Sequence, residues 1–272
     1  MTGNILIASV VLTNSHLQKP MYFFLTNLSI LETCYTSAIL PRILASFISD
    51  YHRISFSGCF IQFYFFATLA TAESYLLSVM SYDRYVAICK PLYYVTLINN
   101  KMCVQLSITS WMIGIVASAF TTFFASQLNY CGPNEIDHFF CDYAPLLRLS
   151  YSDTQQTEMV MTILGSVCTL PPLLFTLASY VCIINTILRI PSNCGRSKAF
   201  STCSSHLIVV SIFYGTLITV YILPKTKKLQ DLNKVFSVFY TILTPMINPF
   251  IYTLRNREFK EAFRKTMTKF LS

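Results

Sequence analysis

Asp83-Arg84-Tyr85 follows a long apolar segment that runs from Cys59 to Val79. Charged side chains are costly inside hydrocarbon, so this pair is expected where a helix leaves a membrane. Arg84 could bind the neighbouring carboxylate, or an acceptor that docks from the adjacent aqueous side. The residue types therefore predict a switch, although a charged pair that only sets helix depth would have the same sequence.

Glu32 and Glu73 are two further residues that could have a chemical role, because each lies within an apolar segment without an adjacent Lys or Arg. Ionisable side chains at membrane depth usually mark a functional site. Pro249 is a third such feature, since it removes a backbone hydrogen bond and bends its helix. Asn248 could satisfy the freed carbonyl and Tyr252 could swing inward, whereas the simpler interpretation is a plain kink.

The composition predicts an integral membrane protein that would position these residues on helices. Apolar residues make up 54% of the chain and charged residues only 12%, against about a quarter charged in soluble domains. The apolar runs are long and do not alternate, which favours helices over a β-barrel. We therefore expect an all-α membrane protein.

The apolar segments predict a seven-helix bundle in a single domain over residues 1–272. The expected spans are residues 1–15, 21–48, 58–88, 102–126, 157–188, 200–223 and 233–254. A span needs about 20 residues, so the first helix is expected to be shortened by truncation at its outer end. Apolar residues recur at helical spacing in 256–270, which predicts a short amphipathic surface helix; a disordered basic tail is the alternative.

The distribution of charge predicts the orientation in the membrane. Lys and Arg far outnumber acids on the face that holds Asp83 and Arg84, and the two balance on the opposite face. Basic residues mark the cytoplasmic side, so the C-terminus is expected in the cytoplasm. The net charge of +8 then reflects topology, and nucleic-acid binding is not expected.

Six motifs occur in this order along the chain: Pro20–Leu25, Met80–Cys89, Ser179-Tyr180, Lys198–Leu207, Phe213–Thr216 and Pro245–Tyr252. With these motifs the chain resembles a rhodopsin-like (class A) G-protein-coupled receptor and, within that class, an olfactory receptor of the tetrapod type. The resemblance implies that Arg84 contacts the G protein, of the stimulatory olfactory type that raises cyclic AMP, in the plasma membrane.

One face of the third span is expected to line a ligand pocket. Five residues share this face by helical spacing: Phe66, Ala67, Ala70, Thr71 and Ser74. The resemblance makes this face an odorant wall, with further lining from Leu164, Cys168, Tyr214, Leu217, Tyr221 and Thr241 and a lid at Tyr143. The lining is mostly apolar, so the ligand is expected to be a small, neutral, volatile molecule. The alternative to a ligand-binding role is ordinary helix packing.

The resemblance also implies a cation site and a disulfide. It brings Asn4, Glu32, Glu73 and Asn248 together, and two neighbouring carboxylates do not both ionise cheaply. A sodium ion or a shared structural proton would resolve this. The disulfide would join Cys59 to Cys141. Cys131 would lack its usual partner, because Tyr151 stands at that position.

The sequence also bears on other classes of function. The sequence has no nucleophile elbow, phosphate loop or zinc motif, so no enzyme, metal centre or cofactor beyond sodium is expected. The partners would be an odorant, a G protein and membrane lipid. The alternatives are a small-molecule receptor outside the nose and a non-functional truncated product. A transporter or channel is disfavoured because repeated halves are not seen.

Overall fold

The computed structural model describes residues 1–49, 53–130, 135–136, 138–151, 154–222, 235–255 and 257–271. These residues form helices and no strand. The α-helices are α1 (Thr2–Thr13), α2 (Pro20–Ser49), α3 (Phe56–Cys89), α4 (Tyr94–Leu97), α5 (Asn100–Ser126), α6 (Tyr143–Arg148), α7 (Gln155–Leu188), α8 (Asn193–Leu217), α10 (Thr244–Arg255) and α11 (Arg257–Leu271). Two π-helical turns, Ile218–Ile222 and Phe239–Leu243, adjoin α8 and α10.

Five stretches among the described residues are long and apolar enough to cross a membrane. They are Pro20–Leu44, α3, α5, α7 and Cys203–Val220. Thr2–Thr13 and Val235–Ile251 are shorter apolar helices. The prediction of an all-α membrane bundle is therefore confirmed, and the chain is a multi-pass membrane protein.

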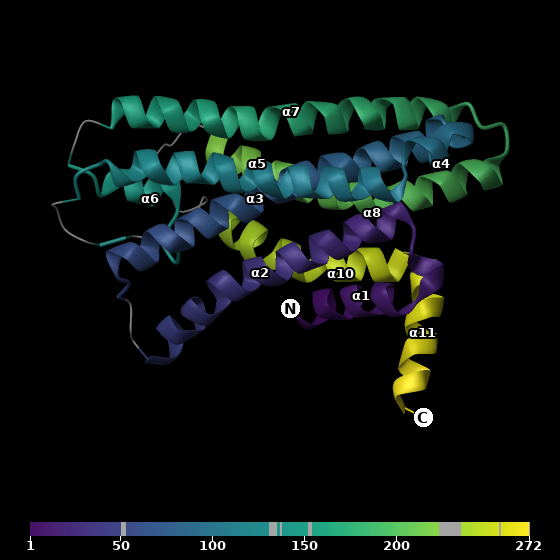
Figure 1. Ribbon diagram of the computed structural model, residues 1–272, viewed down its shortest axis with the longest axis horizontal. Helices are drawn as coiled ribbons and strands as arrows, with labels where there is room; N and C mark the ends of the chain where they lie inside the picture. Colours follow the sequence, from purple (N-terminus) through teal and green to yellow (C-terminus); the bar gives the residue numbers. More distant parts are fainter. Residues whose placement is uncertain are drawn as a thin grey trace.

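The long helices run roughly along the longest axis of the molecule, with α6 at one end and α4 and α11 at the other (Figure 1). We call the end that holds α6 the outer end, and the end that holds α4 and α11 the inner end. α3 is central, with contacts to α2, α5, α7 and α8. α1 lies beside α10 along the inner half only (Figure 1).

Polar caps fix where several helices begin. Side-chain oxygens of Ser55, Asn99 and Ser192 accept hydrogen bonds from backbone N–H groups three residues further on, at 3.1, 2.9 and 3.2 Å. Such caps satisfy amides that have no partner inside the helix. Ser192 accordingly starts α8 at Asn193, earlier than the expected residue 200, because the first turns are polar and do not belong to the apolar run.

A glycine lets α3 and α5 approach closely. A Cβ on Gly114 would lie 2.5 Å from the carbonyl oxygen of Thr68 and 3.2 Å from the amide nitrogen of Ala72. Ser107, Ser110 and Ser118 of α5 are also buried. Small residues at helix contacts are the usual means of tight packing in membranes, so α3 is held in place along its length by α5.

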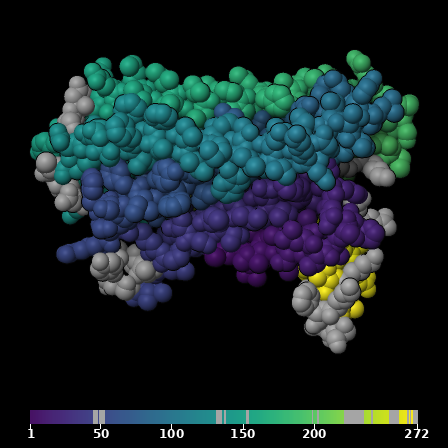
Figure 2. Space-filling view, viewed as in Figure 1, coloured from purple at the N-terminus to yellow at the C-terminus, as the bar shows by residue number. Residues whose placement is uncertain are grey.

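The C-terminal helix α11 turns across the direction of α10 and stands out from the bundle (Figures 1 and 2). Phe259 is buried on one side of α11, whereas Lys260 is exposed on the other. Asn14, after α1, donates a hydrogen bond to the hydroxyl of Thr266 at 3.0 Å. α11 is therefore attached to the bundle along its apolar side, with its polar side outward.

Candidate functional site

The inner end of α3 holds the charged pair that the sequence singled out. Both Nε and Nη2 of Arg84 donate to Oδ2 of Asp83, at 3.0 and 2.5 Å. The Tyr94 hydroxyl donates to the other oxygen, Oδ1, at 2.7 Å. The Asp83 side chain is fully buried and that of Arg84 is 14% exposed. Both carboxylate oxygens are thus engaged, and Arg84 is held against α3.

Tyr94 was missed by the sequence analysis because it lies in a short loop helix with no periodic signal. Burial, followed by the nearby Asp83 charge, raises the pKa of the Tyr94 phenol above its ordinary value. The phenol therefore stays protonated and can donate to Asp83 at neutral pH. The loop is thereby fastened to the charged pair.

A second polar contact joins α7 to α8 at the inner end. The hydroxyl of Tyr180 and Nδ1 of His206 lie 2.6 Å apart, and the two rings are stacked. Both residues are buried, and Nε2 of His206 has no hydrogen-bond partner among the described residues. The sequence motifs contained both residues, but only the fold brings them together. The inner ends of α7 and α8 are therefore linked by one buried polar contact.

The four residues expected at a cation site are all buried in the middle of the molecule. Asn248 donates from Nδ2 to Oε1 of Glu32, and Asn4 donates from Nδ2 to the carbonyl oxygen of Pro245 at 3.2 Å. Glu73 interacts electrostatically with Glu32. One side-chain oxygen each of Asn4, Glu73 and Asn248 is buried without a hydrogen-bond partner among the described residues.

Pro249 lies inside α10, and α1 packs closely against it. A Cβ on Gly3 would lie 3.1 Å from Cβ of Pro249. On the other side, the Ser205 hydroxyl donates to the carbonyl oxygen of Ile251 at 3.5 Å, which links α8 to α10. The side chain of Tyr252 is outside the described residues, so its expected movement stays a prediction.

Phe66, at the outer part of the expected odorant wall, packs in an aromatic cluster. Its ring centroid lies 5.3 Å from that of Tyr35 on α2 and 4.8 Å from that of Phe140 in the loop before α6. His138 and Phe139 stack in the same loop. Sequence reasoning missed Tyr35 and Phe140, because no periodicity relates a loop to a distant helix.

Ser74, deeper on the same face of α3, is joined to α8. The Tyr214 hydroxyl donates to the backbone oxygen of Ser74 at 2.9 Å and lies 3.1 Å from its hydroxyl. Leu217 is buried in the same core cluster as Tyr214. Phe66 belongs to a different cluster, so the expected wall is divided between two packed regions of the bundle.

The other expected lining residues vary in exposure. Ala67, Ala70 and Thr71 on α3 and Leu164 and Cys168 on α7 are half-buried. Thr241 is buried, and its hydroxyl donates to the carbonyl oxygen of Ser237 at 2.6 Å. The side chain of Tyr221 is outside the described residues.

Tyr143, the expected lid, begins α6 and is tied to α7. Its hydroxyl donates to the carbonyl oxygen of Glu158 at 3.5 Å. Burial, together with the Glu158 charge, raises the pKa of the Tyr143 phenol. Tyr143 packs against the buried cluster that contains Cys59, Cys141 and Met161. The lid position is thus connected to α3 and α7.

The outer end is fastened covalently. A disulfide joins Cys59 of α3 to Cys141 before α6, as the resemblance implied. Gln62 reinforces it, since its Oε1 accepts from the amide of Cys141 at 3.1 Å and its Nε2 donates to the carbonyl oxygen of Ala38 on α2 at 3.4 Å. α2, α3 and the loop are therefore connected at one point.

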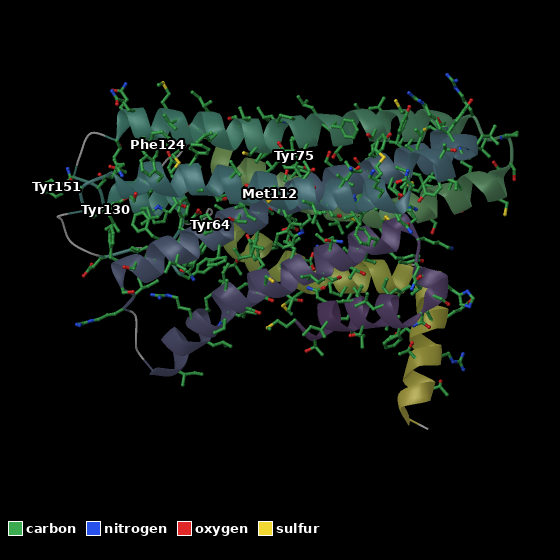
Figure 3. All side chains as sticks on the ribbon, viewed as in Figure 1. Tyr64, Tyr75, Met112, Phe124, Tyr130 and Tyr151 are labelled. Atoms are coloured by element: carbon green, nitrogen blue, oxygen red, sulfur yellow. A yellow bond between two sulfur atoms is a disulfide. The ribbon has the colours of Figure 1, made fainter. Side chains whose placement is uncertain are left out.

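Tyr151 occupies the position at which the resemblance would place the second cysteine of another disulfide. Cys131 is outside the described residues. Tyr151 is 78% exposed, and it lies near Tyr130 at the outer end (Figure 3). Its amide donates to the carbonyl oxygen of Asn129 at 2.9 Å, so a backbone hydrogen bond joins these two stretches of the outer loop.

Comparisons with known proteins agree with these features. The chain matches the family described as olfactory receptor over residues 1–270. It is 52% identical over 262 residues to olfactory receptor 6B1 of Homo sapiens, covering 96% of this chain and 84% of that protein. It is 47% identical over 270 residues to human olfactory receptor 2AP1, covering 99% and 87%. It is 46% identical over 263 residues to olfactory receptor 1G1 of Gorilla gorilla gorilla, covering 97% and 84%. The chain therefore belongs to the olfactory receptor family, and it is an odorant-sensing G-protein-coupled receptor and not an enzyme.

Proposed function

We propose that this receptor detects a small, neutral and mostly apolar volatile molecule in the outer half of the bundle. Support comes from the side chains there, which are apolar apart from the hydroxyls of residues such as Thr71, Ser74 and Tyr214. By resemblance, Phe66 occupies the position at which amine receptors of this class hold a cationic ligand, and it has no carboxylate. An apolar lining with a few polar groups selects ligands of the same character.

The receptor signals through a stimulatory G protein of the olfactory type and raises cyclic AMP. The stimulatory type is proposed from membership of the olfactory receptor family. The observation that supports a switch at the inner end is the engagement of both Asp83 oxygens, by Arg84 and by Tyr94. Ligand binding shifts the population toward a state in which the inner end of α8 moves outward. Arg84 then leaves Asp83 and becomes available to the G protein. In this arrangement the protein lies in the plasma membrane with its C-terminus in the cytoplasm.

The test is the cyclic AMP response of cells that express the chain, measured against a mixed panel of odorants. Arg84→Ala is expected to abolish the response while surface staining persists. Arg148→Ala is the matched control, because Arg148 is an exposed arginine at the outer end, and it should respond normally. A full response from well-stained Arg84→Ala cells would refute the coupling mechanism.

We also propose that Glu32, Glu73, Asn4 and Asn248 hold a sodium ion. The support is the set of buried oxygens without hydrogen-bond partners among the described residues, one each on Asn4, Glu73 and Asn248. Hard cations prefer oxygen ligands of this kind. A bound sodium ion would supply the positive charge that two buried carboxyl groups lack, and these four residues would connect α1, α2, α3 and α10.

The sodium proposal is tested by agonist dose–response curves with sodium or choline as the main extracellular cation. The wild type should change its agonist sensitivity with sodium, and Glu73→Gln should not. Glu158→Gln removes an exposed carboxylate outside the cluster and should behave as the wild type does. If Glu73→Gln leaves both the response and its sodium sensitivity unchanged, the shared-proton alternative replaces the cation.

A further inference from the structure

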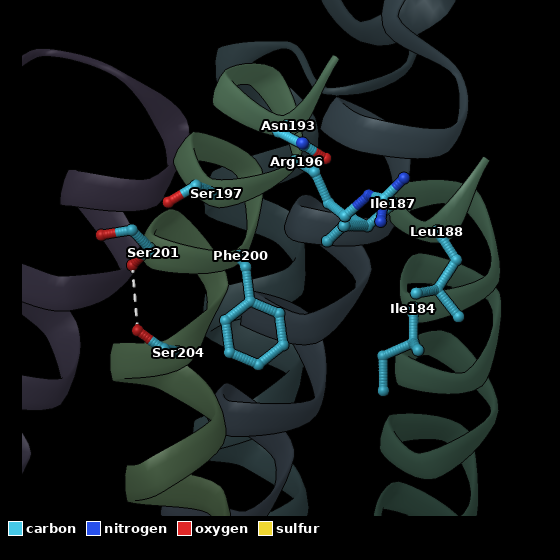
Figure 4. Close-up of a pocket in the computed structure, with 9 residues that line it drawn as sticks. All are labelled: Ile184, Ile187, Leu188, Asn193, Arg196, Ser197, Phe200, Ser201 and Ser204. Atoms are coloured by element: carbon cyan, nitrogen blue, oxygen red, sulfur yellow. Dashed lines mark hydrogen bonds between the residues drawn. The ribbon is translucent and has the colours of Figure 1, made fainter. Parts of the chain in front are cut away.

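A groove of about 500 Å³ lies between the inner ends of α7 and α8 (Figure 4). Ile184 and Leu188 line it from α7, and Arg196 and Phe200 line it from α8. In Figure 4, the side chains of Phe200 and Arg196 extend into the space between the two helices. Among the described residues, the groove therefore combines apolar walls with the cationic side chain of Arg196.

The charge of the groove favours an anionic occupant. Arg196 donates from Nη2 to the carbonyl oxygen of Ile190 at 3.2 Å, but its Nε is buried without a partner among the described residues. Among the described side chains that line the groove, Arg196 is charged and none is a carboxylate. A buried donor without an acceptor costs free energy, which an anionic oxygen at Nε would recover.

The apolar part of the groove is open at the side of the bundle. Leu188 is 60% exposed and Phe200 is 54% exposed. Leu188 ends the membrane-length apolar stretch of α7, and Phe200 lies just before that of α8, so both side chains are expected near the membrane surface. The basic end of the groove lies at the same end of the molecule as Asp83 and Arg84, where phospholipid headgroups begin. Basic pockets between membrane helices at this level bind phosphate headgroups.

We propose that this groove binds an anionic phospholipid, with its phosphate on Arg196 and an acyl chain along Ile184, Leu188 and Phe200. The site is separate from the expected odorant wall and from the Asp83 pair. It draws its lining from both α7 and α8, so the bound lipid contacts both helices. The lipid comes from the cytoplasmic leaflet in the orientation proposed above.

The test uses the purified full chain in detergent, with lipid binding measured by native mass spectrometry. Dioleoyl phosphatidic acid is expected to bind roughly tenfold to a hundredfold more tightly than dioleoylglycerol, which has the same acyl chains without the phosphate, because a charged hydrogen bond is worth that much. Arg196→Gln should remove this preference and Arg196→Lys should retain most of it. Arg264→Gln removes an exposed charge on α11 at the same end and should keep the preference.

Three results would overturn the proposal. Equal binding of the two lipids by the wild type would show that charge does not select the occupant. Equal losses in Arg196→Gln and Arg264→Gln would indicate diffuse surface charge. Displacement of phosphatidic acid by millimolar inorganic phosphate would indicate an anion site without lipid. If Arg196→Gln fails to fold, Leu188→Trp serves instead, since it fills the groove from an exposed position and should weaken phosphatidic acid binding.

Discussion

The outer and inner ends of the bundle are held together by different kinds of interaction. At the outer end, a disulfide joins Cys59 to Cys141, and the aromatic cluster around Phe66 packs beside it. At the inner end, the links among the described residues include hydrogen bonds and an ion pair, through Asp83 and through Tyr180. A covalent bond persists while the receptor signals, whereas polar contacts exchange partners readily.

This difference indicates which end moves. If the ligand binds at the outer end as proposed, the disulfide keeps α3 joined to its loop, and the response is expected where contacts are reversible. Asp83 and His206 each lie in a polar contact that could form a second arrangement. A bistable element of this kind is what coupling between two sites requires. In the function that we propose, the outer end therefore senses the ligand and the inner end changes.

The largest expected effect comes from breaking the outer covalent link. Loss of a disulfide typically costs about 2–5 kcal/mol, so Cys59→Ser is expected to abolish surface expression, and Cys141→Ser should match it. Cys182→Ser is the control, because Cys182 is an exposed free cysteine on α7. Flow cytometry of surface-stained cells measures the effect. Normal expression of Cys59→Ser would mean that packing alone holds the outer end, and the comparison would fail.

A smaller effect is expected from a change at the contact between α3 and α5, the helices that connect the two ends. Gly114→Ala would place a methyl group 2.5 Å from the Thr68 carbonyl oxygen, so α5 must shift, at a cost of about 1–3 kcal/mol. Gly165→Ala is a matched control, since no atom lies within 4 Å of its Cβ position, and it should be neutral or slightly stabilising. The thermal stability of the two purified variants decides between these outcomes. Equal thermal stability of the two variants would show that the close approach of α3 and α5 does not contribute to the free energy of unfolding.

At the inner end, Tyr94→Phe should change activity more than stability. It leaves Oδ1 of Asp83 without its tyrosine donor, which costs the resting state about 1–3 kcal/mol. The population should therefore move toward the open state, and basal cyclic AMP should rise several-fold at unchanged surface expression. A basal level equal to that of the wild type would show that Tyr94 does not stabilise the closed pair.

The same substitution at the outer end gives the smallest effect and completes the comparison. The Tyr130 hydroxyl donates to the carbonyl oxygen of Ala125 at 2.8 Å, so Tyr130→Phe should cost about 1 kcal/mol without raising basal cyclic AMP. An increase in basal activity as large as that of Tyr94→Phe would erase the distinction between the ends.

Tyr130 also predicts a pH dependence. Burial raises the pKa of its phenol from 10.0 to about 12, so the folded protein binds that proton more tightly than the unfolded chain does. The resulting stability is complete below pH 10 and is lost as the pH rises toward 12. Thermal unfolding of wild type and Tyr130→Phe between pH 8 and 11 should show a steeper decline for the wild type.

The sequence predicted features that depend on neighbouring residues or on helical periodicity. Asp83 and Arg84 are adjacent, so their pairing at the end of an apolar run follows from position and charge. The shared face of Phe66 and Ser74 follows from helical spacing. The amphipathic pattern of 256–270 has the same origin, and α11 occupies Arg257–Leu271.

Contacts between distant segments could not be predicted in this way. Tyr94 reaches Asp83 through the bend of a loop, and Phe140 reaches Phe66 because the disulfide draws its loop onto α3. The convergence of Glu32 and Asn248 came from resemblance alone, since their helices are far apart in the chain. The start of α8 was misplaced because an apolar run ends at the hydrocarbon boundary, whereas the Ser192 cap lies beyond it.

The attachment of α11 has a practical consequence for biosensor engineering. Phe259 belongs to the same buried cluster as Leu17 and Leu28, and Thr266 accepts a hydrogen bond from Asn14. A fluorescent reporter inserted before these residues would separate them from the bundle, and an affinity tag that replaces them would remove part of the core. Reporters fused after Ser272 leave the contacts of Phe259 and Thr266 in place. In the function that we propose, they would lie at the end of the receptor that changes conformation.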